Sequence, residues 1–210
     1  NFLSLSTIAI SYKKFPIINM PMALINTVSM QLPVFMLSAY SSSEVVGYYM
    51  MANRILTAPI HLISRSVGQV YYKEAVDCLR LGKKKVVRIF GNTVKQIAKI
   101  GFIPYAIAIV FSPVLTKLFL GDVWTTSGIF MQIMVPWIFF QFVNMTVTTT
   151  FSIVNKQEIG FLLNVISVLL RYFAMYYWNE NAITQITALS IVASLFYITF
   201  MISSYLVLKK

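Results

Sequence analysis

The chain has 210 residues, of which 58% are hydrophobic and only 11% are charged. A soluble domain carries about 25% charged residues, so this composition excludes an ordinary soluble globular protein. The net charge is +11, and the single cysteine, Cys78, excludes a disulfide within the chain. With only one histidine, and with no phosphate-binding loop or nucleophile motif, the sequence predicts no metal site, no cofactor and no enzyme activity.

Three long windows contain no charged residue, over residues 15–43, 123–155 and 181–208. Each exceeds the ~20 residues that a helix needs to cross ~30 Å of hydrocarbon. Backbone polar groups must be paired inside lipid, which favours helices. The sequence therefore predicts an all-α, polytopic membrane helix bundle.

Six transmembrane helices fit the chain. Residues 1–14 are too short to span and are expected to form a cytoplasmic or interfacial lead-in without a signal-peptide pattern. Residues 15–210 are expected to form one six-helix transmembrane lobe of a longer protein, since the sequence begins without Met. The predicted spans cover about 15–40, 45–72, 97–120, 129–154, 159–178 and 186–208.

Lys and Arg gather at alternate ends of these spans, which predicts the orientation. Residues 13–14, 73–99, 156 and 209–210 carry most of them, whereas the intervening ends carry Glu44, Asp122 and Glu180. Both ends of the chain are therefore expected in the cytoplasm. The basic cytoplasmic segment 73–99 can lie along anionic lipid headgroups or act only as a topology anchor. Because the charge follows topology, nucleic acid is not expected as a partner.

The second span carries a row of polar side chains. Successive helix residues turn by about 100°, which places His61 about 20° to one side of Arg54 and Arg65 about 20° to the other, with Gln69 at the edge. We call these four residues the cationic stripe. Two central Arg cost about 5–7 kcal/mol in lipid, and the aliphatic residues of the span return only about 2.4–4.8 kcal/mol. The stripe is therefore expected to face protein or water.

Other spans carry matching polar lines, and no Asp or Glu lies within a span. A bundle that turned these lines inward would enclose a cationic cavity suited to an anionic ligand. The alternatives for each residue alone are interhelical hydrogen bonding and, for Arg171, extension towards the membrane surface. The lines are Asn19, Asn26 and Met30 in the first span; Trp137, Gln141, Asn144 and Thr148 in the fourth; Gly160, Asn164, Ser167 and Arg171 in the fifth; and Ser190, Ser194, Tyr197, Met201 and Ser204 in the sixth.

Residues 12–75 resemble bacterial polysaccharide flippases, the O-antigen and capsule repeat-unit translocases of the multidrug/oligosaccharidyl-lipid/polysaccharide exporter superfamily. The resemblance rests on "YKKFP" at 12–16, "VGYY" at 46–49, "ANRIL" at 52–56 and "GQVYY" at 68–72. The later stretch "LFLGDVWTTSG" at 118–128 looks like an outer loop of this family, with Leu120 where Phe is usual.

This resemblance implies two six-helix lobes around a central cavity, with this chain as the second lobe and the N-terminal lobe of the same chain as its partner. It implies translocation of a polyprenyl-linked substrate, an undecaprenyl-pyrophosphate-linked oligosaccharide, across the bacterial cytoplasmic (inner) membrane for O-antigen or capsule biosynthesis. Arg54 transfers as a substrate-binding residue on its motif, whereas the helix faces suggest the same role for His61, Arg65, Gln69, Asn144 and Arg171. The alternatives are a cation-coupled multidrug antiporter of the same fold and a membrane-embedded polysaccharide-assembly enzyme.

Overall fold

The computed structural model describes residues 14–79 and 82–209, with the side chains of 14–19 and 22 left out. The Asn19 side chain and residues 1–13 of the predicted lead-in therefore lie outside the described part of the chain. The described residues form helices joined by short turns. The long helices are α2 (Lys14–Tyr40), α3 (Ser43–Pro59), α4 (Arg65–Leu79), α5 (Lys83–Leu120), α6 (Thr125–Val147), α8 (Gln157–Tyr177) and α9 (Ala182–Lys209). The short elements are the π-helix η1 (Ile60–Ser64), the 3₁₀-helix η2 (Asp122–Trp124) and α7 (Thr150–Ile153).

The protein is a multi-pass membrane helix bundle, as its composition predicts. Five stretches of the described chain are long and apolar enough to cross a membrane: Ala23–Tyr40, Lys83–Leu120, Asp122–Ile153, Gln157–Tyr177 and Ala182–Lys209. They correspond to five of the six predicted spans. The remaining span is the rod formed by α3, η1 and α4, which carries the cationic stripe and is less apolar than the other five.

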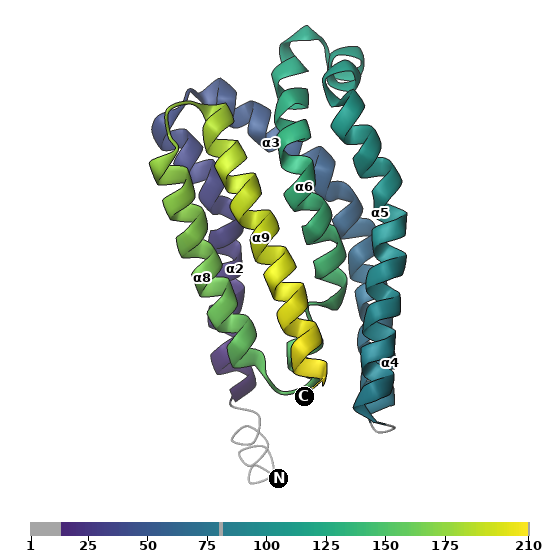
Figure 1. Cartoon of the computed structure of the whole chain (residues 1–210). Helices are drawn as coiled ribbons and strands as arrows, with labels where there is room; N and C mark the ends of the chain where they lie inside the picture. The colour runs from purple at the N-terminus through teal and green to yellow at the C-terminus, as the bar shows by residue number, and fades with distance from the viewer. Residues whose placement is uncertain (1–13, 80–81, 210) are drawn as a thin grey trace, which may run out of the picture.

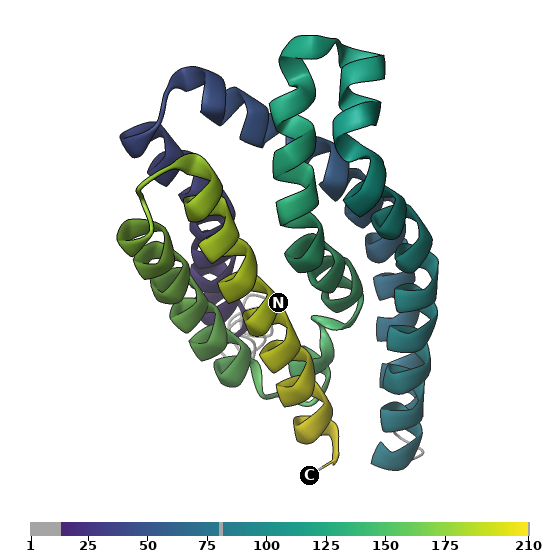
Figure 2. The ribbon, with the colours of Figure 1, turned by 45° about the horizontal axis from the view of Figure 1, so that its top comes forward.

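The helices form two groups that meet at α6. Helices α2, α8 and α9 pack together on one side, and α4, α5 and α6 on the other, with α3 crossing between them against α6 (Figures 1 and 2). Helix α6 is the centre of the bundle, because 61% of its span is buried against 22–28% for the other four. Its contacts with α9 join the two groups, and it also packs against α3 and α5.

Two glycines allow α5 and α6 to pack closely. A Cβ atom at Gly128 would lie 2.4 Å from the Cα of Pro113, and one at Gly101 would lie 2.7 Å from the ring of Phe142. Small residues let membrane helices approach when lipid provides no hydrophobic drive for association. Hydroxyl groups add bonds between helices: Ser64 Oγ donates to the Phe142 carbonyl at 2.9 Å, and Ser127 Oγ to the Tyr48 carbonyl at 2.6 Å.

The second predicted span, formed by α3, η1 and α4, is not a single regular α-helix. The predicted angles between the residues of the cationic stripe assumed that it was. Pro59 has no N–H to continue the hydrogen-bond ladder, and the π-helix η1 follows it directly. Tyr105 of α5 supports the transition by donating its hydroxyl to the Leu56 carbonyl at 3.0 Å. A π-helix has more residues per turn than an α-helix, so Arg65 is rotated relative to Arg54 from the position that 100° steps predict.

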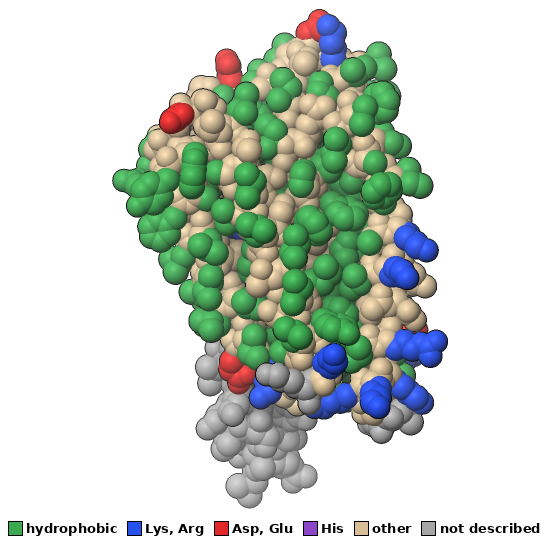
Figure 3. All heavy atoms as spheres, viewed as in Figure 1, with side chains coloured by type: hydrophobic (Ala, Val, Ile, Leu, Met, Phe, Trp, Pro, Cys, Tyr) green, Lys and Arg blue, Asp and Glu red, His purple; other side chains and the backbone are tan. Residues whose placement is uncertain are grey.

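The basic segment 73–99 is not a separate surface element. It spans the end of α4 and the first part of α5, which pack on each other as a hairpin. Helix α5 has 38 residues and is about 57 Å long at 1.5 Å per residue, so it extends well beyond ~30 Å of hydrocarbon. Figure 3 shows basic side chains gathered towards the lower right of the bundle and acidic ones at the top, with a basic side chain also at the top and an acidic one at the lower left. The charge asymmetry that the sequence indicates therefore runs along the bundle axis.

The fourth predicted span is broken near its end. Helix α6 ends at Val147, and the single turn α7 follows after Thr148 and Thr149. The break leaves backbone carbonyls without their usual helical N–H partners. The Thr150 hydroxyl pairs with one of them, because its Oγ1 donates to the Val147 carbonyl at 2.6 Å. Broken helices of this kind occur in membranes where they line a cavity.

Candidate functional site

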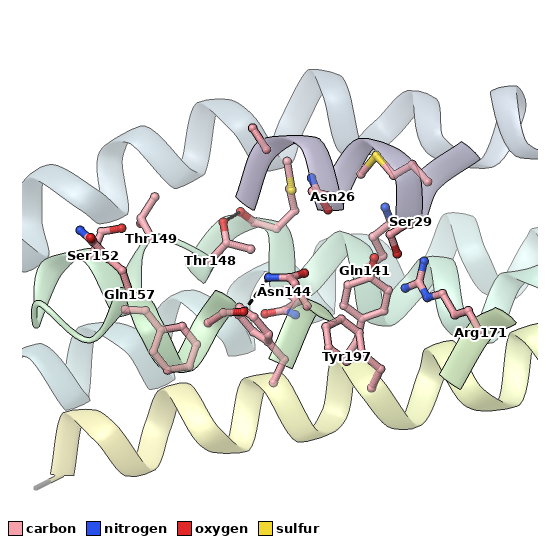
Figure 4. Close-up of a pocket in the computed structure, with 18 residues that line it drawn as sticks. Asn26, Ser29, Gln141, Asn144, Thr148, Thr149, Ser152, Gln157, Arg171 and Tyr197 are labelled. Carbon is pink, nitrogen blue, oxygen red and sulfur yellow. Dashed lines mark hydrogen bonds between the residues drawn. The ribbon is translucent and has the colours of Figure 1, made fainter. Parts of the chain in front are cut away.

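A cavity of about 310 Å³ lies between α2, α6, α8 and α9 (Figure 4). Its long axis follows α8, from Gln157 in the first turn to Arg171, about 21 Å further along the helix. Figure 4 shows the Arg171 guanidinium at one end, directed towards Gln141 and Ser29, and Ser152 and Gln157 at the other. The polar lining residues are Asn26 and Ser29 from α2, Gln141 and Asn144 from α6, Thr148, Thr149 and Ser152 from the broken end of α6 and from α7, Gln157, Asn164 and Arg171 from α8, and Tyr197 from α9.

Arg171 is the only charged side chain among these lining residues, and it is 3% exposed. Three aromatic rings surround its guanidinium carbon, with the ring centroids of Trp137, Phe196 and Tyr197 at 5.5–5.7 Å. Cation–π contacts of this kind contribute on the order of 1–2 kcal/mol each when water is excluded. They do not pair the N–H donors, and Arg171 Nε has no hydrogen-bond partner among the described residues.

Two buried carboxamides lie along the same cavity. Gln141 is 7% exposed and Asn144 is 1% exposed, and the side-chain oxygens of both lack a hydrogen-bond partner among the described residues. Leaving a buried polar group unpaired costs roughly 1–3 kcal/mol of folding free energy. A native cavity that holds several such groups is therefore suited to binding a polar ligand or water. The cavity therefore offers a cation, amide donors and amide acceptors together.

Helical spacing explains how the sequence builds this lining. Gly160, Asn164 and Arg171 recur on one face of α8, and Asn164 is held there by donating its Nδ2 to the Gly160 carbonyl at 2.8 Å. Gln141, Asn144 and Thr148 follow the same rule on α6. Three of the polar lines that the sequence predicts, in the first, fourth and fifth spans, thus meet at one cavity.

Most residues of the polar line in the sixth predicted span do not line the cavity. Only Tyr197 of that line contacts the cavity. Ser190 Oγ donates to the Ile133 carbonyl of α6 at 2.7 Å, and Ser194 and Ser204 donate to carbonyls of their own helix. These serines therefore act in packing, which is the alternative interpretation of such residues. Ser167 is buried but does not line the cavity either.

The cationic stripe does not join this cavity. Arg54, His61, Arg65 and Gln69 are all exposed, on α3, η1 and α4, and none of them lines it. The expectation that Arg54, Arg65 and Arg171 converge on one interior is therefore wrong for this lobe. The stripe lies on the outside of the six-helix bundle because Ala52, Leu56 and Ile60 turn the opposite side of the rod into the core.

The sequence analysis did not predict several residues that line the cavity. Gln157 lies between two predicted spans, Thr149 and Ser152 lie where the fourth span breaks, and Ser29 is the polar neighbour of Met30. Phe196 and Phe200 read as ordinary core residues of α9, yet they face the cavity and Phe196 contacts Arg171. The run of threonines at 146 and 148–150 was the signal in the sequence that α6 would break.

The chain was compared with known proteins. A family model described as "Polysaccharide biosynthesis protein" matches residues 5–128, more than half of the chain. The chain belongs to this family. No curated protein and no solved structure matches the chain. The family match covers α2 to α5 and includes the whole cationic stripe, whereas most of the cavity residues on α6, α8 and α9 follow it in the sequence. Membership of the polysaccharide biosynthesis family and the membrane fold agree with the flippase resemblance in its general terms.

Proposed function

We propose that this protein translocates lipid-linked oligosaccharide repeat units, carried on undecaprenyl pyrophosphate, across the bacterial cytoplasmic membrane for O-antigen or capsule synthesis. The observation that carries the proposal is the buried, unpaired Arg171 in a polar cavity of a membrane protein of the polysaccharide biosynthesis family. A buried cation without a carboxylate partner costs several kcal/mol, and an anionic substrate offsets that cost.

In this proposal the two cationic features act at different places. The exposed stripe residues Arg54, His61, Arg65 and Gln69 face the first lobe and hold the pyrophosphate in the cavity between the lobes. Arg171 and Asn144 lie deeper and receive part of the oligosaccharide. The polyprenyl tail stays in lipid, the lobes rock about the bound headgroup, and the basic end of the bundle stays in the cytoplasm.

The cavity favours this function over a cation-coupled multidrug antiporter. Such an antiporter needs a carboxylate within the membrane to hold its ion, and the described cavity presents Arg171 and carboxamides instead. We also propose a transporter rather than an assembly enzyme, because an arginine flanked by amides binds an anion without supplying a general acid–base pair.

A flipping assay tests the proposal. The full-length protein is reconstituted into liposomes with a fluorescent undecaprenyl-pyrophosphate oligosaccharide, and translocation is followed by chemical quenching from outside. The wild type is expected to flip the lipid, and the double variant Arg54→Gln, Arg65→Gln is expected to fall to the rate of empty liposomes. Arg88→Gln, an exposed charge on α5 away from both sites, is the matched control and should flip normally.

Two results would contradict the proposal. One is a wild-type rate no higher than that of empty liposomes. The other is elongation of the glycan by the purified protein, which would make it an assembly enzyme.

A further inference from the structure

We infer that the basic end of α5 is a docking surface for an acidic helix of a soluble partner protein. Four exposed side chains make the contacts: Lys84, Arg88, Lys95 and Lys99. We call these four residues the basic ridge. The inference goes beyond the proposed function and does not depend on it, because the ridge lies on the outside of the bundle and takes no part in the transport path.

The basic ridge is a straight row along one side of α5. Steps of 100° place the four side chains within a sector of about 60°, and the row is about 22 Å long at 1.5 Å per residue. The opposite side of the helix is buried through Val86, Phe90 and Ile97. In Figure 3, Lys and Arg side chains follow the right-hand edge of the molecule, where Figure 1 shows α5 and α4. All four side chains of the ridge are therefore accessible to a partner.

The ridge has a rigid support. In this region α5 packs against α4, where Ala75 and Val86 are fully buried and the rings of Tyr71 and Phe90 meet edge to face, with their centroids 6.4 Å apart. A packed helical hairpin holds its surface charges at fixed spacing. Binding to a rigid partner then requires little ordering of the hairpin, which favours association.

Half of the ridge lies too far from the membrane to be held by lipid. Exposed apolar side chains occur on α5 throughout residues 100–119, a length of about 29 Å that matches ~30 Å of hydrocarbon. With the hydrocarbon edge at residue 100, Lys95 and Lys99 lie within the adjoining headgroup layer of about 5–8 Å. Arg88 and Lys84 lie about 18 and 24 Å beyond that edge. Their distance from the headgroups exceeds the ~8 Å screening length of physiological salt.

The charges of the ridge are not compensated within the described part of the chain. Among the described residues, the one ion pair joins Lys117 to Asp122, at the opposite end of α5. The first turn of α5 also has no acidic residue and no capping side chain at Gly82, although cations are disfavoured at the positive end of a helix dipole. Carboxylates from a partner would relieve both. A second helix with acidic side chains at the same spacing fits this row, since both helices rise by 1.5 Å per residue.

The role of a topology anchor does not account for this arrangement. An anchor requires only Lys and Arg near the ends of the spans, whichever helix face they occupy. It needs neither a row on one face of a packed hairpin nor charges held beyond the reach of lipid. The ridge divides into a pair at the headgroups, Lys95 and Lys99, and a pair in water, Lys84 and Arg88, so the two pairs can be tested separately.

The test measures peptide binding to the purified full-length protein in phosphatidylcholine nanodiscs, by fluorescence anisotropy at low salt. The probe is an Ala-rich helical peptide with Glu at positions i, i+4, i+11 and i+15, which repeats the spacing of the ridge. The comparison peptide has the same composition, with its Glu residues spread around the helix. We expect the matched peptide to bind about tenfold more tightly, because only it forms four ion pairs at once. The preference should weaken as salt is added.

Paired variants assign this binding to the ridge. Lys84→Gln, Arg88→Gln should abolish the preference, whereas Lys156→Gln, Lys209→Gln, which removes the same charge from other exposed positions, should retain it. Reversal of all four ridge residues to Glu should make the protein reject the Glu peptide and bind a matched Lys peptide, a gain that a misfolded protein would not show. Arg88→Gln remains a suitable control for flipping, because no partner protein is present in that assay.

Three results would overturn the inference. The first is equal binding of the matched and comparison peptides by the wild type. The second is a preference that survives in Lys84→Gln, Arg88→Gln and is lost in Lys95→Gln, Lys99→Gln, which would assign the ridge to lipid headgroups. The third is a charge-reversed protein that does not bind the Lys peptide. None of these results affects the flipping assay, so the two proposals are tested separately.

Discussion

Arg171 shows why a membrane protein keeps a charge that weakens its fold. The side chain is 3% exposed, and its guanidinium contacts three aromatic rings, with its Nε unpaired. Removing a guanidinium from water costs several kcal/mol, and cation–π contacts return only part of this cost. Apolar replacements of buried charged groups are often neutral or stabilising for that reason. A residue retained at such a cost is expected to serve binding rather than stability.

This view predicts opposite effects on stability and transport. Arg171→Met keeps a similar volume and removes the charge, so it should leave the free energy of unfolding unchanged or raise it on the order of 1 kcal/mol, while translocation is lost. Thermal unfolding of the detergent-purified full-length protein and the flipping assay measure the two effects. Arg54→Met, at an exposed position, should change stability by no more than about 0.5 kcal/mol. A large loss of stability in Arg171→Met alone would assign Arg171 to packing.

The interhelical hydroxyl bonds are the second feature at this scale. Ser64 is fully buried, and its Oγ donates to the Phe142 carbonyl of α6. Ser64→Ala should destabilise the protein by about 0.6 kcal/mol and by no more than about 1.7 kcal/mol, the average and the maximum measured for hydrogen bonds between membrane helices. Ser66→Ala is the control, because Ser66 is exposed and bonds only within its own rod. Equal stability of the two variants, measured by unfolding in detergent, would show that the Ser64 bond contributes nothing.

At the scale of elements, glycine and proline decide where the helices meet and how they turn. Gly128 brings α6 against Pro113 of α5, in the helix pair that flanks the acidic turn η2. Pro59 ends α3 and is followed by the π-helix that re-aims α4. Neither effect is visible in a hydropathy pattern, which treats each span as a straight rod. At this end of the pair, the approach of α5 to α6 therefore depends on the absence of a side chain at Gly128.

A pair of glycine variants tests this dependence. Gly128→Ala would place a Cβ 2.4 Å from backbone, so we expect a loss of stability of about 1–3 kcal/mol as α5 and α6 separate. Gly47→Ala is the matched control, because nothing lies within 4 Å of a Cβ there and alanine is the better helix former, by up to about 1 kcal/mol. Unfolding temperatures of the two variants should therefore move in opposite directions. A harmless Gly128→Ala would mean that the α5–α6 contact is looser than described.

At the scale of the whole molecule, charge is separated along the bundle axis. The basic hairpin of α4 and α5 lies at one end, and Glu44, Asp122 and Glu180 lie at the opposite helix ends. Basic loops are retained in the cytoplasm during insertion, so this asymmetry predicts one orientation for the whole bundle. The hairpin reaches past the hydrocarbon and would stand in the cytoplasm.

Cysteine labelling tests this orientation. Starting from a full-length cysteine-free protein that includes Cys78→Ala, Lys84→Cys marks the hairpin and Glu44→Cys marks the opposite end, and both positions are exposed. In intact cells a membrane-impermeant maleimide should label Glu44→Cys and not Lys84→Cys. Inside-out vesicles should give the reverse. Labelling of Lys84→Cys in intact cells would invert the proposed topology and with it the proposed direction of transport.

The sequence predicted many of the residues that line the cavity. It did not predict the complete set of lining residues. Asn26, Gln141, Asn144, Asn164 and Arg171 were identified because polar residues at helical spacing share a face. Gln157 and Ser152 were missed because they lie at helix ends, where a periodic pattern carries no information. The sequence also proposed Arg54, Arg65 and Arg171 for one interior, although only Arg171 is buried.

The sequence by itself determined that this is a membrane helix bundle, where its spans lie, and which polar residues share a helix face. Each of these properties depends on local hydropathy, length and periodicity, which act within one helix. Only the tertiary structure decided that Arg171 and Asn144 meet in one cavity while Arg54 and Arg65 remain outside it. That outcome depends on which helices pack together, on close approach at Gly128 and on the turn after Pro59, and these are set by contacts between residues far apart in the chain.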